Sequence, residues 1–161
     1  MTDPLVVARL RAAGCVWAED EAAALERSAA TPDELEALVA RRVAGEPHET
    51  VLGWVEFLGR RLVVAPGVFV PRRRTQLLAR LTLTQVADRG RPDELSPVVV
   101  EMCCGVAPVA SCFGWRGAEV HAADVSTDAL ACARANAPTA DLHLGDLYDA
   151  LPDRLHAELV R

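Results

Sequence analysis

The chain of 161 residues is long enough for one ordinary domain, or for a small helical domain followed by part of a larger one. Hydrophobic residues make up 51% and charged residues 25%, which suits a globular core and excludes a chain too polar to fold. The net charge of -6 argues against direct nucleic-acid binding, because phosphate attracts a basic surface. No apolar run approaches the roughly 20 residues of a membrane span, and no export signal is present, so we expect a cytoplasmic protein.

The five cysteines form an odd-numbered set with no Cys-x-x-Cys spacing, and the four histidines lie far from them. This pattern favours reduced, mostly buried thiols and predicts no metal site. Short basic clusters at 41–42, 60–61 and 72–74 could meet an acidic partner or simply be solvated.

A small helical domain is predicted over residues 1–49. Its first helix starts at Asp3-Pro4, because aspartate caps free amide groups and proline fits the first helical position, and it ends at Gly14. A second helix is predicted at about 20–28. A third, over 32–44, follows a threonine cap and carries a glutamate at the capping-box position.

A β-hairpin linker is predicted over residues 50–71, where the hydrophobic spacing changes and Gly53, Gly59 and Pro66-Gly67 interrupt it. Pro71 stops the extended run. A helix is predicted at 75–87, with three leucines on one side, and a polar loop at 88–97 follows it.

Strands alternate with helices from residue 98 onward. We expect strands at 98–102, 119–123 and 141–144, with helices around 109–113 and 127–136. This alternation predicts βαβ crossovers and a parallel sheet, hence an α/β fold. The segment 72–161 has room for the cofactor-binding half of a Rossmann-like domain but not for its second half.

Acidic residues stand at or just past the ends of all three predicted strands, namely Glu101, Asp124 and Asp146. In a doubly wound sheet the carboxyl ends of strands line the ligand crevice, so these groups could converge on one small molecule. Asp124 follows Gly105 by 19 residues, close to the spacing at which a carboxylate accepts both hydroxyls of an adenosine ribose. The alternative is that they are ordinary loop carboxylates.

The glycine turn at 105–110, Gly-Val-Ala-Pro-Val-Ala, lacks the Gly-x-Gly-x-x-Gly pattern that a dinucleotide pyrophosphate requires. A nucleotide-dependent oxidoreductase is therefore poorly supported. A sulfur-based adenosyl cofactor has no pyrophosphate and needs one close approach of the backbone, which Gly105 alone can provide.

Several segments resemble, in order and spacing, the HemK/PrmC-type protein-(glutamine-N5) methyltransferases. The resemblance covers about residues 40–150, whereas residues 1–40 match that family only in being helical. The segments are Gly45-Glu46-Pro47, Val51-Leu52-Gly53, Glu56-Phe57, Gly59, Leu62, Val64, Val70-Pro71-Arg72, Thr75, Glu101 to Gly105, Asp124 and Gly145-Asp146-Leu147. The family is known for S-adenosylmethionine-dependent methylation of the glutamine in the Gly-Gly-Gln loop of peptide chain release factors.

The resemblance implies a set of cofactor-binding residues. One group would lie beside the methionine part of the cofactor, one would hold the ribose, one would border the adenine and one would stand at the mouth of the pocket. In that order they are Cys103, Cys104 and Gly105; Asp124; Asp146 and Leu147; and Phe69, Pro71, Arg72 and Thr75. Glu101 and Val125 complete the predicted cofactor-binding set. The helical domain would grip a protein substrate of the release-factor type.

The chain departs from the family pattern at three places. The family's Asn-Pro-Pro-Tyr motif occurs nowhere in it, and its expected place is just after Arg161, since 155–161 resembles the approach to the strand that carries it. We therefore assign no catalytic residue and expect no methyl transfer by this chain alone. Ala107 adds a methyl group where the backbone should approach the ligand, and Pro108 removes one amide donor, so weak or absent cofactor binding is expected. Gln76 stands where the family has a glutamate.

In the family's topology a fourth strand pairs with the free side of the first strand, so an ending before it would leave Val98, Val99 and Val100 on an open sheet edge. We expect either a partner at this edge, for example a second copy in a homodimer through the first strand, or rearrangement or aggregation of the segment. A fragment with no activity of its own is a further alternative. A non-catalytic interaction module or oligomer derived from a methyltransferase is the alternative function.

Overall fold

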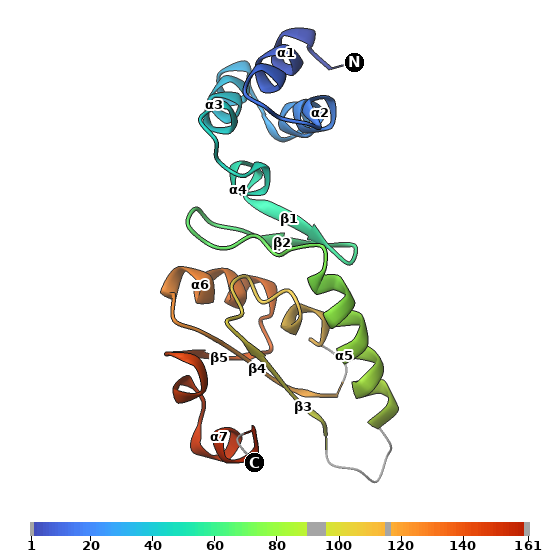
Figure 1. The fold of residues 1–161 in the computed structure, drawn as a ribbon, viewed down its shortest axis with the longest axis vertical. Coiled ribbons are helices and arrows are strands. Elements are labelled where there is room, and N and C mark those ends of the chain that lie inside the picture. The colour runs from blue at the N-terminus through green and yellow to red at the C-terminus, as the bar shows by residue number, and fades with distance from the viewer. Residues whose placement is uncertain (1, 90–95, 115–116, 160–161) are drawn as a thin grey trace. The chain divides into compact units, whose positions relative to one another are not determined.

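The computed structural model describes residues 2–89, 96–114 and 117–159 and divides into two compact units, 1–53 and 54–161 (Figure 1). The first unit contains α1 (Pro4–Ala12), α2 (Ala18–Ser28), α3 (Pro32–Val43) and the short α4 (His48–Leu52). The three predicted helices are confirmed, although α2 begins two residues earlier than expected. Throughout the described ranges, every helix falls short of the length and apolar character needed to cross a bilayer.

The helix caps of the first unit form as the sequence predicts. Asp3 accepts a hydrogen bond from the Leu5 amide at 2.8 Å, and the Thr31 hydroxyl accepts one from the Glu34 amide at 3.2 Å. The Glu34 carboxylate reaches back one residue further than in the usual capping box and accepts from the Ala30 amide at 2.7 Å. The helices enclose a small core that includes the fully buried Leu10, Leu25 and Val39.

The predicted hairpin is present, as antiparallel β1 (Trp54–Phe57) and β2 (Arg60–Val63). The expectation that extended structure begins at Thr50 is wrong, because residues 50–52 belong to α4. The Val51 amide donates to the Pro47 carbonyl at 3.0 Å, and Gly53, with φ at +76°, ends this helical turn. The strands therefore start only at Trp54.

The second unit continues with α5 (Thr75–Arg89) and a parallel sheet in the order β3-β4-β5. The strands are β3 (Val98–Met102), β4 (Glu119–Asp124) and β5 (Asp141–Leu144), and α6 (Thr127–Asn136) connects the last two. The predicted strands and parallel sheet are confirmed. The fold is α/β: helices plus a parallel three-stranded sheet, in agreement with part of a Rossmann-like domain.

Three expectations about the second unit need correction or restriction. The helix expected at 109–113 is only a 3-10 turn, η1 (Ala110–Cys112). Of the segment 155–161, expected just before a further strand, residues 155–159 lie in α7 (Asp153–Leu159), which follows the 3-10 turn η2 (Leu147–Ala150), and residues 160–161 lie outside the described ranges. Of the loop predicted at 88–97, residues 88–89 end α5, and residues 90–95 lie outside the described ranges.

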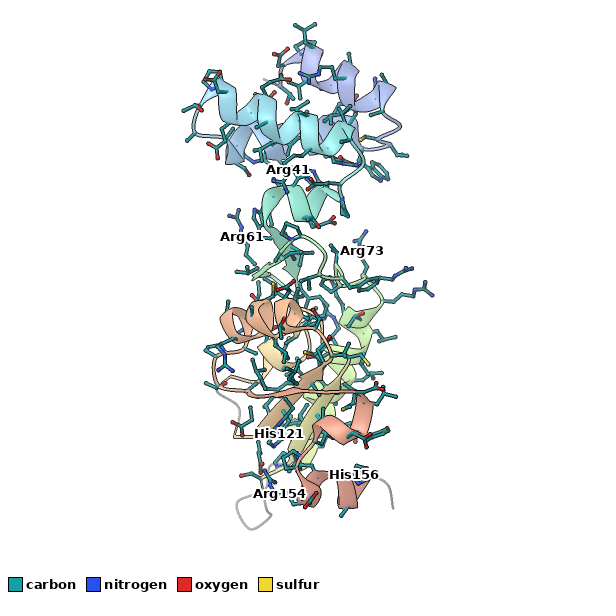
Figure 2. The ribbon with its side chains drawn as sticks, turned by 90° about the vertical axis from the view of Figure 1, so that its left-hand side faces the viewer. Arg41, Arg61, Arg73, His121, Arg154 and His156 are labelled. Atoms are coloured by element: carbon teal, nitrogen blue, oxygen red, sulfur yellow. The ribbon has the colours of Figure 1, made fainter. Side chains whose placement is uncertain are left out.

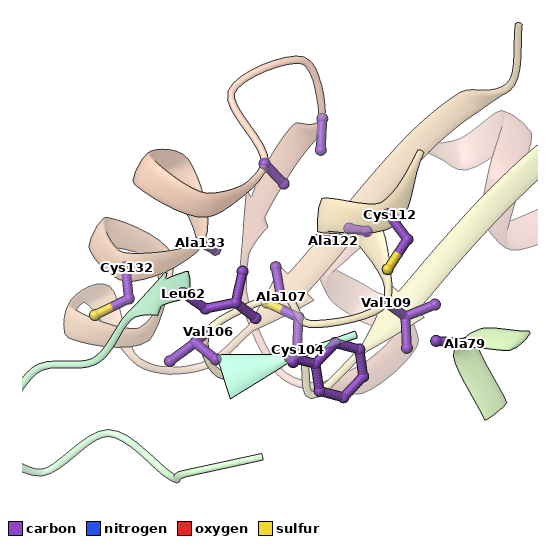
Figure 3. Close-up of a cluster of buried hydrophobic side chains, with 14 of the residues drawn as sticks. Leu62, Ala79, Cys104, Val106, Ala107, Val109, Cys112, Ala122, Cys132 and Ala133 are labelled. Atoms are coloured by element: carbon purple, nitrogen blue, oxygen red, sulfur yellow. The ribbon is translucent and has the colours of Figure 1, made fainter. Parts of the chain in front are cut away.

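Side chains from the hairpin, α5, the glycine turn, β4 and α6 meet in one hydrophobic core, shown in Figure 3. Leu62 of the hairpin is buried there together with Val106, Ala122 and Ala133. The hairpin thus packs within the second unit. The domain boundaries at 49/50 and 71/72 stay a prediction.

The opposite face of the sheet is covered by α7 (Figure 1). Leu155 is fully buried there beside Ala123. At the start of the strands, the buried His121 ring lies 2.7 Å from the Glu119 carboxylate and 3.0 Å from the His143 ring. Arg154 of α7 pairs with Glu119 and lies close to His121 (Figure 2). An apolar contact and a polar network therefore both hold α7 against the sheet.

The Asn136 side chain fixes the hairpin to the α/β body. Its Oδ1 accepts from the Val63 amide at 2.7 Å, while its Nδ2 donates to the carbonyls of Val63 at 3.0 Å and Val106 at 2.9 Å. One amide thus joins β2, the glycine turn and the end of α6. Arg60 adds a second link by donating to the Ser111 carbonyl.

We predict that Asn136→Ala lowers the free energy of unfolding by about 2 kcal/mol, because three hydrogen bonds are lost together. Urea denaturation followed by circular dichroism measures this. The matched control is Arg134→Ala, at an exposed position of the same helix. Its free energy of unfolding is expected to stay within about 0.5 kcal/mol of the wild-type value. Equal stability of the two variants would contradict the anchoring role.

Candidate functional site

A cavity of about 660 Å³ lies at the carboxyl ends of β3 and β4, wholly within the second unit. Its size falls in the range of small-molecule sites, about 300–1,000 Å³. The structure brings eight of the twelve residues predicted for the cofactor to its wall. They are Phe69, Pro71, Thr75, Glu101, Cys103, Cys104, Gly105 and Asp124.

A second cavity of about 80 Å³ adjoins the first, because Cys103 and Asp124 line both. Three more predicted residues lie at its wall, Val125, Asp146 and Leu147. Arg72 lines neither cavity. Its guanidinium lies 5.6 Å from the centre of the Phe69 ring, within the range of a cation–π contact. The assignment of all twelve residues to a cofactor stays a prediction.

Asp124 joins the two cavities and is held by the backbone on both oxygens. Its Oδ2 accepts from the Gly105 amide at 2.8 Å, and its Oδ1 accepts from the Ser126 amide at 2.9 Å. The second bond belongs to the turn that starts α6, where Ser126 is the cap. A carboxylate offers about four acceptor positions, so a ligand hydroxyl can still bind.

Three residues in and just before the glycine turn adopt left-handed backbone conformations, Cys103 at φ +50°, Gly105 at +54° and Ala107 at +55°. Only Gly105 adopts such a conformation without a Cβ penalty, and the other two store strain at this site. The expectation that the Ala107 methyl crowds the ligand is wrong. That methyl is completely buried in the hydrophobic core and does not line either cavity (Figure 3).

Glu101 holds the end of the glycine turn through two backbone amides. Its two oxygens accept from the Val109 amide at 3.2 Å and the Ala110 amide at 2.7 Å. Burial raises the pKa of Glu101 to about 7, although the two amides oppose the rise. This carboxylate therefore titrates near neutral pH while it holds the start of η1.

The two neighbouring thiols differ in their surroundings. Cys104 is buried, and burial, together with the nearby charges of Glu101 and Asp124, raises the pKa of its thiol to about 12. Cys103 is exposed and lines both cavities. All five cysteines are free thiols, and within the described residues no group of three or more metal-ligating side chains is arranged to hold a metal ion.

Gly145 allows β5 to contribute to the site. A Cβ at this position would lie 2.9 Å from the Ala150 Cα, which is too close, so only glycine fits. The Gly145 amide donates to the Asp124 carbonyl at 3.2 Å. The end of β5, with Asp146, is thereby held beside the end of β4.

Sequence reasoning missed several residues of the larger cavity. Ser126 carried a usable signal, since a serine three residues before Ala129 on an amphipathic segment is a helix cap, and it does accept from that amide at 3.3 Å. Leu78 and Thr82 had no such signal in the sequence. They lie far from any strand end in sequence, and only packing brings α5 against the cavity.

We predict that the protein loses stability between about pH 4.5 and 7 through Glu101. Unfolded glutamate titrates near 4.5, so between about pH 4.5 and 7 the folded state keeps a proton that the unfolded chain has lost. The stabilisation is full below pH 4.5 and is lost as the pH rises through 7. Urea titrations should show that the free energy of unfolding of the wild type falls by about 2 kcal/mol more than that of Glu101→Gln over this interval. Parallel pH profiles would refute this.

Comparison with known proteins shows that this chain is similar to methyltransferases. A release factor glutamine methyltransferase of Bordetella pertussis is 36% identical over 127 residues, which cover 76% of this chain and 46% of that protein. One of Corynebacterium glutamicum is 32% identical over 155 residues, 92% of this chain and 54% of that protein. A 4-amino-L-phenylalanine/4-methylamino-L-phenylalanine methyltransferase of Streptomyces pristinaespiralis is 33% identical, over 71% of this chain and 41% of that protein.

The chain spans about half the length of these curated relatives. No family model matches it. The relatives named as release factor glutamine methyltransferases share 32–38% of aligned residues with it, over most of its length. On this similarity and on its parallel sheet, the chain belongs to the HemK/PrmC-type methyltransferase family.

Proposed function

We propose that the chain binds S-adenosylmethionine in the cavity at the ends of β3 and β4. The observation that carries this proposal is the bond between the Gly105 amide and the Asp124 carboxylate at 2.8 Å, at the junction of the two cavities. This hydrogen bond holds together the Gly105 backbone, which a ligand can approach closely, and the Asp124 carboxylate, which can accept hydrogen bonds from the ribose hydroxyls. That is the geometry expected for an adenosyl ligand without a pyrophosphate.

The charge of the site suits this ligand. S-adenosylmethionine has a positive sulfonium and an ammonium group, and Glu101 and Asp124 supply two carboxylates at the cavity wall. In the proposed pose the ribose hydroxyls bind Asp124, and the adenine lies in the smaller cavity beside Val125 and Leu147. A bound cation next to Glu101 would also favour the ionised form of that side chain.

We expect the affinity to be low. Pro108 lines the cavity and removes one amide donor from the turn.

The chemistry proposed for the family site is transfer of the cofactor's methyl group to a glutamine side-chain nitrogen of a protein substrate of the release-factor type. An amide nitrogen is a weak nucleophile, because its lone pair is delocalised, so it must be oriented and hydrogen-bonded. Residues 1–161 contain no Asn-Pro-Pro-Tyr motif for this task. We therefore propose cofactor binding in the cytoplasm without methyl transfer by these residues alone.

A second candidate function is a non-catalytic interaction module. One observation favours it: in the part of the chain that the structure describes, Leu77, Leu78 and Leu81 of α5 are more than half exposed and β3 pairs on one side only. The homodimer expected from the sequence belongs to this candidate.

Calorimetric titration with S-adenosylmethionine tests cofactor binding. Asp124→Asn is expected to weaken it at least about tenfold, because charge-assisted hydrogen bonds to the ribose are lost. Asp124 also forms hydrogen bonds to the backbone, so its substitution can disturb the fold. Asp146→Ala is therefore the second variant, because the Asp146 side chain makes no capping hydrogen bond to η2. We expect it to weaken cofactor binding less than Asp124→Asn does. The exposed Asp128→Asn is the control and should bind like the wild type. No detectable heat with the wild type, or equal affinities in all four proteins, would refute the assignment.

Mass spectrometry of a release factor incubated with the purified chain and cofactor tests the second part. We expect no mass gain on the Gly-Gly-Gln glutamine. A protein in which residues 1–161 continue into Asn-Pro-Pro-Tyr is the positive control and is expected to transfer the methyl group. Methylation by residues 1–161 alone would show that another group orients the amide.

A further inference from the structure

Charge is distributed unevenly along the chain. Residues 57–87 contain six arginines and no acidic residue, which gives this segment a charge of +6. Since the whole chain carries -6, the remaining residues carry -12. The positive segment runs from the end of β1 through β2 and most of α5. Such a separation of charge indicates an electrostatic role for the segment.

Three of these arginines stand at the edge of the large cavity. Arg72, Arg73 and Arg74 are exposed, and we call them the arginine rim. The residues on either side of the rim, Pro71 and Thr75, line the cavity, whereas the rim itself does not. The three rim carbonyls accept hydrogen bonds from the amides that follow at 2.9–3.1 Å, and Figure 2 labels Arg73 at this place. The backbone of the rim is therefore fixed at the start of α5.

The local electrostatics of the helix opposes this arrangement. The amino end of a helix carries a partial positive charge, which favours acidic residues and disfavours arginine. Helix α5 is 15 residues long and has no acidic residue in its first turn. Natural sequences keep such a local conflict mainly at functional sites. Among the described residues no carboxylate forms an ion pair with the rim, although other arginines of the chain do form ion pairs, namely Arg9, Arg11, Arg41, Arg42 and Arg154.

An aromatic ring stands beside the rim. Phe69 lines the cavity and is 65% exposed, and the Arg72 guanidinium lies 5.6 Å from the centre of its ring. A guanidinium over an aromatic ring keeps the N–H groups at its edge available to a carboxylate. Arg80, about two helical turns further along α5, is also exposed and extends the positive surface. The next acidic residue of this helix, Asp88, lies about 20 Å beyond the rim.

The cavity is therefore bordered by charges of opposite sign. Glu101 and Asp124 belong to its wall at the ends of β3 and β4, and the rim stands at the start of α5. We propose that the arginine rim binds an acidic segment of a polypeptide partner, beside the place where a side chain of that partner enters the cavity. That the partner is a polypeptide rests on the proposed function, whereas the preference of the rim for carboxylates does not.

A polypeptide fits this surface better than a nucleic acid does. A nucleic acid is held by many phosphate contacts along an extended basic surface. The rim is short, and the carboxylates of the cavity wall and the net charge of the chain oppose a long row of phosphates. An acidic peptide segment meets only the rim, and Phe69 offers an apolar contact to one of its side chains.

Fluorescence anisotropy of a labelled peptide tests this proposal. The peptide carries glutamates on both sides of a central Gly-Gly-Gln, and in its neutral counterpart glutamines replace the glutamates. We expect the acidic peptide to bind at least about tenfold more tightly than the neutral one, and the difference to shrink at high salt. Arg73→Ala combined with Arg74→Ala should weaken binding of the acidic peptide at least about fivefold and leave the neutral peptide unaffected. The matched control, Arg27→Ala with Arg134→Ala, removes two exposed positive charges elsewhere and should bind like the wild type.

Two further measurements separate this role from a structural one and from cofactor binding. The double rim variant should resist urea at least as well as the wild type, because it removes cations from the amino end of α5. Absence of calorimetric heat with S-adenosylmethionine, together with binding of the acidic peptide, would refute the cofactor site and support the rim. Equal affinity for the two peptides, tighter binding of a single-stranded RNA of the same charge, equal losses in the rim and control variants, or a less stable rim variant would overturn the proposal.

Discussion

The hydrogen bond from the Gly105 amide to the Asp124 carboxylate organises the candidate site. It joins the ends of β3 and β4 at 2.8 Å, and the other oxygen of the same carboxylate holds the Ser126 amide at the start of α6. The neighbouring Gly145 amide then binds the Asp124 carbonyl, which brings in β5. One residue thus sets the relative positions of three strand ends, and the two cavities meet there.

The carboxylates that shape this site also support the fold. Glu101 holds the amides of Val109 and Ala110, so the turn between β3 and η1 depends on the same side chain that faces the cavity. Burial brings its pKa to about 7, and Cys103 and Ala107 hold left-handed conformations nearby. Strain and an unfavourably buried carboxyl group are common where a structure is prepared for a ligand. Here the hydrophobic core beneath the glycine turn offsets the cost of the strain and of the buried carboxyl group.

A second feature lies along the same large cavity. Within the described ranges, β3 pairs with β4 on one side only, and Leu77, Leu78 and Leu81 of α5 are more than half exposed. Leu78 and Thr82 of α5 line the cavity together with Val99 and Val100 of β3, so α5 and β3 form one wall of the candidate site.

The sequence by itself determined the α/β class, the strand positions, the caps at Asp3 and Thr31, and the places of Gly105 and Asp124 at the ends of neighbouring strands, because these depend on periodicity and on spacing along the chain. The tertiary structure alone decided that Thr50 starts no strand, that the Ala107 methyl points into the core, and that Asn136 ties the hairpin to the sheet. It also decided which face of α5 is exposed. The physical reason is that a local pattern shows which residues are apolar, whereas burial and distant hydrogen bonds depend on which surfaces meet.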